Sequence, residues 1–230
     1  LILYSIFKSS FSQTLLNQNK NKMNIIVFGA NGTVGIEIVK QALAKGHHVT
    51  AFVRNPNKLE IAESPRLTIH QGDVLQLESV RNAVRNQDVV LCALGDGKIG
   101  KIRAAGTQNI ITAMQAEGVQ RLICQSTIGA GDSYKHLNFV WKYVMFGFLL
   151  KRVLPDHNLQ EQFIKKSALN YTIVRPSALT DGEITNGYKV DFGKEPTKLS
   201  LKISRKEVAY LMLKQIENTE FSRKAVNISH

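Results

Sequence analysis

Short apolar runs rich in β-branched residues alternate with segments of helical periodicity from Asn24 onward. The apolar runs predict strands at 24–28, 49–53, 67–70, 88–94, 121–126, 171–174 and 226–228. In the first predicted helix Val34, Ile38 and Ala42 share one face, and Gly46 is placed to end it. Further helices are predicted at about 76–86, 103–117, 156–168 and 204–217.

This alternation predicts βαβ units, and therefore a parallel sheet with helices on both faces. The last predicted helix opens with Ser204-Arg-Lys-Glu207, a capping-box pattern. We expect a single domain over residues 23–230, with small C-terminal elements on the substrate side. Residues 1–22 contain no acidic residue, and Met23 stands directly before the first strand. We therefore expect residues 1–22 to be a disordered or non-native extension, with a targeting peptide as the alternative.

The stretch MNIIVFGANGTVG joins the first predicted strand to the first predicted helix. Its first glycine would permit a tight turn, its second would let the backbone approach a pyrophosphate, and its third would let helix and strand pack. The helix N-terminus adds N–H groups that bind phosphate. A glycine-rich turn with a purely structural role is the alternative. The residues predicted to bind a dinucleotide here are Gly29, Ala30, Asn31, Gly32, Thr33, Val34 and Gly35.

The end of the second predicted strand indicates which dinucleotide binds. A site for NAD usually has Asp or Glu there, which accepts from the ribose 2′-OH. This strand ends in VTAFVRN, with Arg54 in that place. An arginine can pair with a 2′-phosphate that a carboxylate would repel. We therefore predict NADP(H) as the cofactor, with a solvated surface arginine as the alternative.

Other strand ends supply further candidates, because ligands of doubly wound sheets bind at the carboxyl ends of the strands. Asp73 is placed to accept from the adenine amino group, and Val74 to contact the ring. The remaining cofactor candidates follow the fourth, fifth and sixth strands and are Ala93, Leu94, Gly95, Ser126, Thr127, Pro176 and Ser177. The set predicts an α/β fold with a doubly wound parallel Rossmann sheet.

The chain resembles the atypical short-chain dehydrogenase/reductases, within them the NAD(P)H-binding group that includes biliverdin reductase B (flavin reductase) and the NmrA-like proteins. The resemblance rests on GANGTVG, FVRNP, GDVLQ, ALG, ICQST, DHNLQE, LNYTIVRPSALTDG and ISRKEVA, and covers most of residues 23–230. It implies a Rossmann sheet, an NADPH site at these strand ends and Ser126 as the active-site serine. It also implies a substrate-side position for Ile128, where the bilin enzyme has Phe. That enzyme has Pro-Pro-His in place of Arg175-Pro176-Ser177.

The segment that directly follows the fifth predicted strand offers Tyr134-Lys135 and Trp141-Lys142-Tyr143, and neither has the Tyr-x-x-x-Lys spacing of the catalytic pair in most short-chain dehydrogenases. Its spacing occurs at Tyr4 and Lys8, before the cofactor loop, where we interpret it as coincidence. Tyrosine-type alcohol dehydrogenation is therefore not expected. We expect an NADPH-dependent reductase of a planar conjugated acceptor, such as a flavin, bilin or quinone, whose own electronics assist hydride transfer. Ser126 would position the substrate or relay a proton, or would only bind the nicotinamide ribose. The alternative function is a non-catalytic NADP(H)-binding regulator of the NmrA-like type.

Charge and composition limit the classes of molecule that the chain is expected to bind. The formal net charge is +12, but no basic run of five or more residues occurs, so an anionic cofactor and substrate explain the charge without nucleic acid. Cys92 and Cys124 lie in apolar runs without ligand spacing, so we expect buried thiols and no metal site. We expect a cytoplasmic monomer or weak homo-oligomer, with organellar targeting by residues 1–22 left open.

The segment LNFVWKYVMFGFLL, residues 137–150, contains Trp141, the single tryptophan of the chain. It is too short to cross a bilayer. Three interpretations remain open: packing on the core, a lid that places Trp141 against a planar substrate, and a surface helix that touches a membrane or a partner.

Overall fold

The computed structural model describes residues 22–95, 100–136, 151–191 and 199–230. The predictions for residues 1–21 and for Trp141 lie outside these ranges. Within them, eight strands form one sheet in the order β3-β2-β1-β4-β5-β6-β10-β8. Their bounds are β1 Asn24–Phe28, β2 His48–Val53, β3 Leu67–Gln71, β4 Val89–Cys92, β5 Arg121–Gln125, β6 Asn170–Pro176, β8 Lys189–Val190 and β10 Lys224–Ser229. Every neighbouring pair is parallel except β10 with β8. The predicted doubly wound sheet is confirmed.

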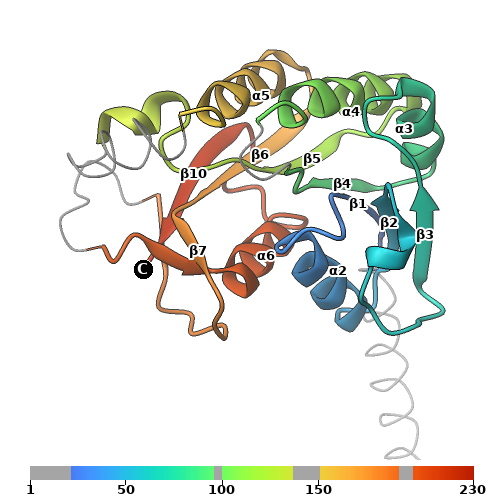
Figure 1. Cartoon of the computed structure of the whole chain (residues 1–230), viewed down its shortest axis with the longest axis horizontal. Coiled ribbons are helices and arrows are strands. Elements are labelled where there is room, and N and C mark those ends of the chain that lie inside the picture. The colour runs from blue at the N-terminus through green and yellow to red at the C-terminus, as the bar shows by residue number, and fades with distance from the viewer. Residues whose placement is uncertain (1–21, 96–99, 137–150, 192–198) are drawn as a thin grey trace, which may run out of the picture.

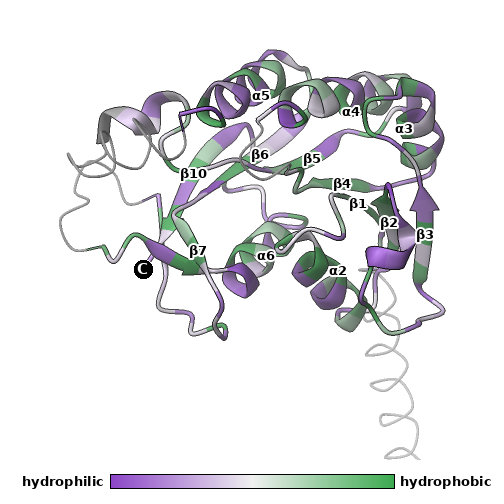
Figure 2. Ribbon diagram, viewed as in Figure 1, coloured by the Kyte–Doolittle hydropathy of each residue, from purple (hydrophilic) through white to green (hydrophobic). Residues whose placement is uncertain are grey.

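Helices cover both faces of the sheet, as predicted (Figure 1). One face carries α2 (Gly35–Ala44) and α6 (Arg205–Lys214). The other carries α3 (Leu77–Val84), α4 (Arg103–Glu117) and α5 (Leu154–Lys166). Figure 2 shows hydrophobic residues along the strands and on the sheet-facing sides of these helices. Each face therefore has its own apolar core.

The strands can be recognised in the sequence because this sheet is buried on both sides. In β1 every residue after Asn24 is buried, so a continuous apolar run replaces the alternation of a half-exposed strand. Cys92 and Cys124 are paired in register on β4 and β5, and both are free and buried. The prediction of buried thiols is confirmed.

Helix ends follow local sequence signals. The capping box at Ser204 and Glu207 is formed in full, which confirms that prediction. Gly46 follows α2 with a φ of +88°, and its N–H donates to the Leu43 carbonyl. Helix α5 begins at Leu154, two residues before the predicted start, because Pro155 is tolerated in the first helical turn.

Short elements near the C-terminal part of the sheet complete the fold. Strand β7 (Ala178–Thr180) pairs in parallel with β9 (Lys202–Ser204), which forms a separate two-stranded sheet. Two 3₁₀ helices lie at η1 (Pro56–Lys58) and η2 (Gly131–His136). In the described ranges no helix is both long and apolar enough to cross a membrane.

Candidate functional site

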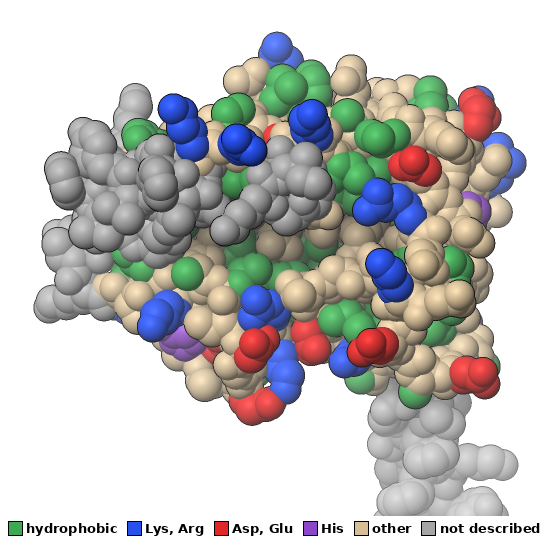
Figure 3. Space-filling model, in the orientation of Figure 1, with side chains coloured by type: hydrophobic (Ala, Val, Ile, Leu, Met, Phe, Trp, Pro, Cys, Tyr) green, Lys and Arg blue, Asp and Glu red, His purple; other side chains and the backbone are tan. Residues whose placement is uncertain are grey.

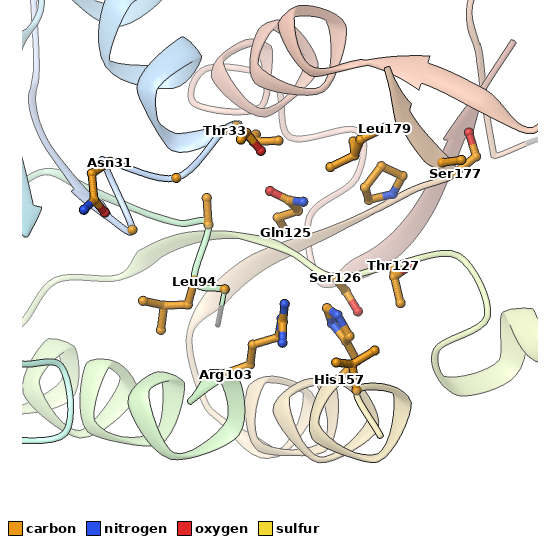
Figure 4. Close-up of a pocket in the computed structure, with 18 residues that line it drawn as sticks. Asn31, Thr33, Leu94, Arg103, Gln125, Ser126, Thr127, His157, Ser177 and Leu179 are labelled. Atoms are coloured by element: carbon orange, nitrogen blue, oxygen red, sulfur yellow. The ribbon is translucent and has the colours of Figure 1, made fainter. Parts of the chain in front are cut away.

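A pocket of about 530 Å³ lies at the carboxyl ends of β1, β4, β5 and β6 (Figure 4). Figure 3 shows hydrophobic side chains within a hollow on this face, with Lys and Arg side chains around it. The described residues that line the pocket are Gly29, Asn31, Gly32, Thr33, Val34, Ala93, Leu94, Gly95, Arg103, Gln125, Ser126, Thr127, Val153, His157, Pro176, Ser177, Ala178 and Leu179. One cavity thus joins the glycine loop to the ends of the central strands.

The glycine loop is shaped so that its backbone faces the pocket. Gly29 has a φ of +80°, and a Cβ placed on it would lie 2.5 Å from the Ala93 carbonyl oxygen on the neighbouring strand end. A Cβ on Gly35 would collide with the Gly29 carbonyl oxygen, so the third glycine allows α2 to start against the turn.

The N-terminus of α2 suits a phosphate. No described side chain caps it. The Ile36 N–H donates to the Gly32 carbonyl oxygen at 2.9 Å, so a ligand at the pocket would use the other N–H groups of this turn. Ser177 adds a buried Oγ with no hydrogen-bond partner among the described residues. A backbone cradle, an open helix N-terminus and an unpaired buried hydroxyl together fit a dinucleotide.

The structure brings most of the predicted site residues together, because twelve of them line the pocket. The other candidates among the described residues do not line it. Ala30 is a buried residue of the loop itself, and Ile128 is buried with its N–H donating to the Pro176 carbonyl. Gly35 packs α2 against the turn.

The predicted adenine-side residues lie at the same sheet edge but outside this pocket. Arg54 follows β2 directly and is exposed. Asp73 follows β3, and its Oδ1 accepts from the Leu75 N–H at 3.0 Å. Val74 is buried and lies against the backbone of α4, since a Cβ on Gly106 would come within 2.9 Å of its side chain. Arg54 follows β2, the neighbour of β1, and Asp73 and Val74 follow β3, the next strand of the sheet, so all three lie on the side of β1 toward which a dinucleotide that crosses the glycine loop would continue.

Ser126 is part of a buried ionic network at the opposite end of the pocket. Its Oγ donates to Glu161 Oε1 at 2.8 Å, and Arg175 donates to both oxygens of Glu161 at 2.8 and 2.6 Å. The exposed fractions of Ser126, Glu161 and Arg175 are 2%, 1% and 1%. Arg175 also reaches the exposed carboxylate of Asp132 at 2.8 Å, and Lys165 lies 3.2 Å from Glu161.

The network keeps Glu161 ionised. Burial alone would raise the pKa of its carboxyl, but the hydrogen bonds and charge of Arg175, with the charge of Lys165, hold that pKa below its usual value. Because an ionised carboxylate only accepts hydrogen bonds, it fixes the direction of the Ser126 hydroxyl.

Six pocket residues escaped the sequence-based prediction: Arg103, Gln125, Val153, His157, Ala178 and Leu179. Figure 4 shows the side chains of Arg103 and His157 pointing into the pocket from α4 and α5. Asp156 holds these two helices together, since its carboxylate accepts from the backbone N–H groups of Arg103 and Ala104 at 3.1 and 3.0 Å. The DHNLQE motif contained Asp156 and His157, but only the packing of α5 on α4 places them at the site.

A family model supports a dinucleotide-binding assignment, and two relatives match most of the chain. The family model described as NAD(P)H-binding matches residues 29–219. An uncharacterized chloroplastic protein of Arabidopsis thaliana is 32% identical over 219 residues, which cover 89% of this chain and 75% of that protein. The photosystem II assembly factor Ycf39 of Synechocystis is 26% identical over 167 residues, which are 70% of this chain and 47% of that factor. This chain therefore spans about half the length of the Synechocystis relative.

Solved structures share the fold. ChuY, an anaerobilin reductase of Escherichia coli O157:H7, has a TM-score of 0.76 at 22% identity, covering 89% of this chain and 96% of that one. A short-chain dehydrogenase/reductase of Veillonella parvula in complex with NADP has a TM-score of 0.74 at 19% identity, covering 90% and 94%. The glycine loop, the sheet order and the matched residues agree, and the chain belongs to the NAD(P)H-binding family.

Proposed function

We propose that this chain is an NADPH-dependent reductase that transfers hydride to a planar conjugated acceptor, such as a flavin, a bilin or a quinone. The observation that carries the proposal is the single pocket that runs from the glycine loop to Ser126. A bound dinucleotide would supply the hydride. The protein's part is to hold it along the strand ends and to leave room for a second molecule.

The far half of the pocket has the character of a site for a flat apolar ligand. Val153 contributes an apolar side chain there, and Pro176 adds a rigid ring. Ser126 and Ser177 add hydroxyl groups that can fix the ligand's orientation. The structural neighbour ChuY is an anaerobilin reductase, which favours a bilin or a related conjugated molecule.

The lining of the pocket also favours such an acceptor. No tyrosine is among the described residues that line it, so none of them offers an acidic phenol. Without that acid, acceptors whose conjugation spreads the arriving charge are better substrates than simple ketones.

Arg54 supports NADP(H) over NAD(H). It stands at the end of β2, beside the glycine loop on β1, and it is exposed to solvent where a ribose 2′-phosphate would arrive. A structural neighbour has been solved with NADP. The chloroplastic location of the Arabidopsis relative favours an organellar site of action over a cytoplasmic one.

The test is NADPH oxidation by the purified chain, followed at 340 nm, with FMN, biliverdin and a quinone as separate acceptors. We expect at least one acceptor to be turned over, with kcat/KM for NADPH on the order of tenfold or more above that for NADH, since the 2′-phosphate adds a charged hydrogen bond of about 1.5–3 kcal/mol. The control omits the acceptor. Tight NADPH binding with no consumption in any of the three reactions would contradict the reductase.

That contrary result would favour the second candidate, a non-catalytic NADP(H)-binding regulator. The specific support for it is the likeness to a photosystem II assembly factor, together with the lack of a tyrosine among the described residues that line the pocket. A regulator would bind the dinucleotide and present a surface to a protein partner.

A further inference from the structure

The hydroxyl of Ser126 already donates a hydrogen bond within the protein. Its proton points to Glu161 Oε1 at 2.8 Å, and Arg175 holds that carboxylate from its other side. What Ser126 presents to the pocket is therefore its oxygen lone pairs, which accept a hydrogen bond. Losing the proton from Ser126 would also place a second anion beside a buried carboxylate, which is costly. Ser126 is thus a positioning acceptor and a poor acid.

His157 lies one helical turn before Glu161 on α5, so the two side chains share a face of that helix. It is 8% exposed and lines the same pocket as Ser126. Figure 4 shows its ring and the Ser126 side chain directed into the same part of the pocket. An imidazole here can reach a ligand whose orientation Ser126 fixes.

The charged surroundings of His157 come from several elements. Arg103 of α4 lies on the same side of the pocket, with its guanidinium 3.7 Å from the carboxylate of Asp156, which precedes His157 on α5. Glu161 and Arg175 neutralise each other one turn further along, with Asp132 and Lys165 at the outer side of that pair. Among the described residues that line the pocket, Arg103 and His157 alone carry ionisable side chains. Arginine does not release its proton in proteins, whereas histidine loses and regains one near neutral pH.

We propose that His157 is the general acid of this site and protonates the acceptor while the acceptor is reduced. The inference rests on the proposed reductase function. The acceptor gains a hydride, with both electrons, from the dinucleotide at an electron-poor carbon or nitrogen. His157 gives a proton to the conjugated nitrogen or oxygen where the negative charge collects. The neutral imidazole then takes a proton from solvent, so one NADPH and one H⁺ are consumed for each two-electron reduction.

The assignment narrows the substrate class. The acceptor must carry a nitrogen or oxygen that becomes basic on reduction, conjugated with the atom that takes the hydride. Flavin, bilin and quinone all meet this condition. A cationic acceptor that becomes neutral on taking hydride would gain nothing from His157.

The experiment compares His157→Gln with the matched surface variant His48→Gln, since His48 is exposed at the start of β2. We expect His157→Gln to lower kcat by about 10²–10⁴-fold, with the Kd for NADPH changed by less than about threefold. For the unmodified chain kcat should fall as the pH rises above about 6.5, where histidine ordinarily loses its proton. His157→Gln should lack this decline, His48→Gln should match the unmodified chain, and imidazole should restore part of the activity of His157→Ala.

A second readout needs no turnover. In the ¹H–¹³C NMR spectrum, the ring signal that disappears in His157→Gln should titrate between pH 5 and 8 in the unmodified chain, because an acid must be protonated before it can act. A ring that stays neutral across this range would overturn the proposal. So would a His157→Gln variant that keeps the kcat and pH decline of the unmodified chain, or a lowered kcat with the same decline and no imidazole rescue. In each of these cases a chain that still reduces its acceptor leaves the reductase function standing. A chain that reduces no acceptor removes both proposals.

Discussion

At the scale of single residues, the site depends on an ion pair that a protein interior rarely contains. Arg175 is the largest fully buried side chain among the described residues, and Glu161 neutralises it through two hydrogen bonds. Burying either charge alone would cost several kcal/mol, so each residue is tolerated only because of the other. The same carboxylate orients Ser126, which ties the stability of this region to the geometry of the pocket.

Replacing Glu161 with Gln should therefore destabilise the fold strongly. The change keeps the shape but leaves the Arg175 charge without its counter-ion, and we expect the free energy of unfolding at pH 7 to fall by about 3–5 kcal/mol. Because the folded-state pKa of Glu161 is lowered, its stabilisation is complete above the unfolded value near 4.5 and is lost as the pH falls through the folded value. The difference between the two proteins should therefore shrink in acid.

Urea unfolding at pH 7 and at several points below pH 4.5 measures this difference. The matched control is Asp132→Asn, which removes the other carboxylate that Arg175 contacts. Its side chain is 76% exposed, so the loss should stay below about 1 kcal/mol. Equal losses for the two variants would show that burial does not set the strength of this pair.

At the scale of elements, the turn from β1 into α2 makes the site possible. A residue with a positive φ at Gly29 lets the chain leave β1 and present its backbone to the pocket, and the neighbouring end of β4 leaves no room for a side chain. Helix α2 then begins without a side-chain cap. A phosphate would accept hydrogen bonds from the N–H groups of this turn that have no partner within it.

A comparison of Gly29→Ala with Gly118→Ala separates the effect of a steric clash from the effect of backbone strain. Gly118 ends α4 at a φ of +75°, close to the +80° of Gly29, but nothing lies within 4 Å of a Cβ built on it. Gly118→Ala should lower the free energy of unfolding by about 1–2 kcal/mol and leave NADPH binding unchanged. Gly29→Ala should cost a further 1–3 kcal/mol or so from overpacking against Ala93, and should raise the Kd for NADPH more than about tenfold.

Urea unfolding and NADPH fluorescence titration measure the two effects. If Gly118→Ala weakened NADPH binding as much as Gly29→Ala, the binding loss would reflect general destabilisation rather than a displaced loop.

The elements also show which features the sequence can predict. A strand buried on both faces, such as NIIVF in β1, is recognisable because its apolar run is continuous. Strands β7 and β9 are three residues each and pair Ala178 with Lys202, so they have no local periodicity to detect. Only small elements are expected here from the sequence. The two strands form because they pair with each other in the folded chain.

At the scale of the whole molecule, the glycine loop could be predicted from the sequence, whereas the charged residues near Ser126 could not, for one physical reason. The loop's residues are neighbours in sequence, so a local pattern describes their chemistry. His157 and Glu161 reach Ser126 only because α5 packs beside α4 on the sheet, and Arg103 joins them from α4. No spacing in the sequence specifies that these side chains come together at one site.

Ligand-linked stability is the whole-molecule consequence of the cofactor assignment. A ligand at about 100 times its Kd stabilises the folded state by about 2.7 kcal/mol, which raises Tm by roughly 5–10 °C for a chain of this size. We expect NADP⁺ to give such a shift and NAD⁺, at equal concentration, a smaller one.

Arg54→Asp should reduce the NADP⁺ shift by roughly 3–5 °C for each tenfold loss of affinity and leave the NAD⁺ shift unchanged. Lys224→Asp changes the net charge equally at the start of β10, which lies next to the edge strand β8 on the other side of the sheet, and should alter neither shift. Differential scanning fluorimetry measures all three proteins, and equal losses for both dinucleotides in Arg54→Asp would show that Arg54 does not bind the 2′-phosphate.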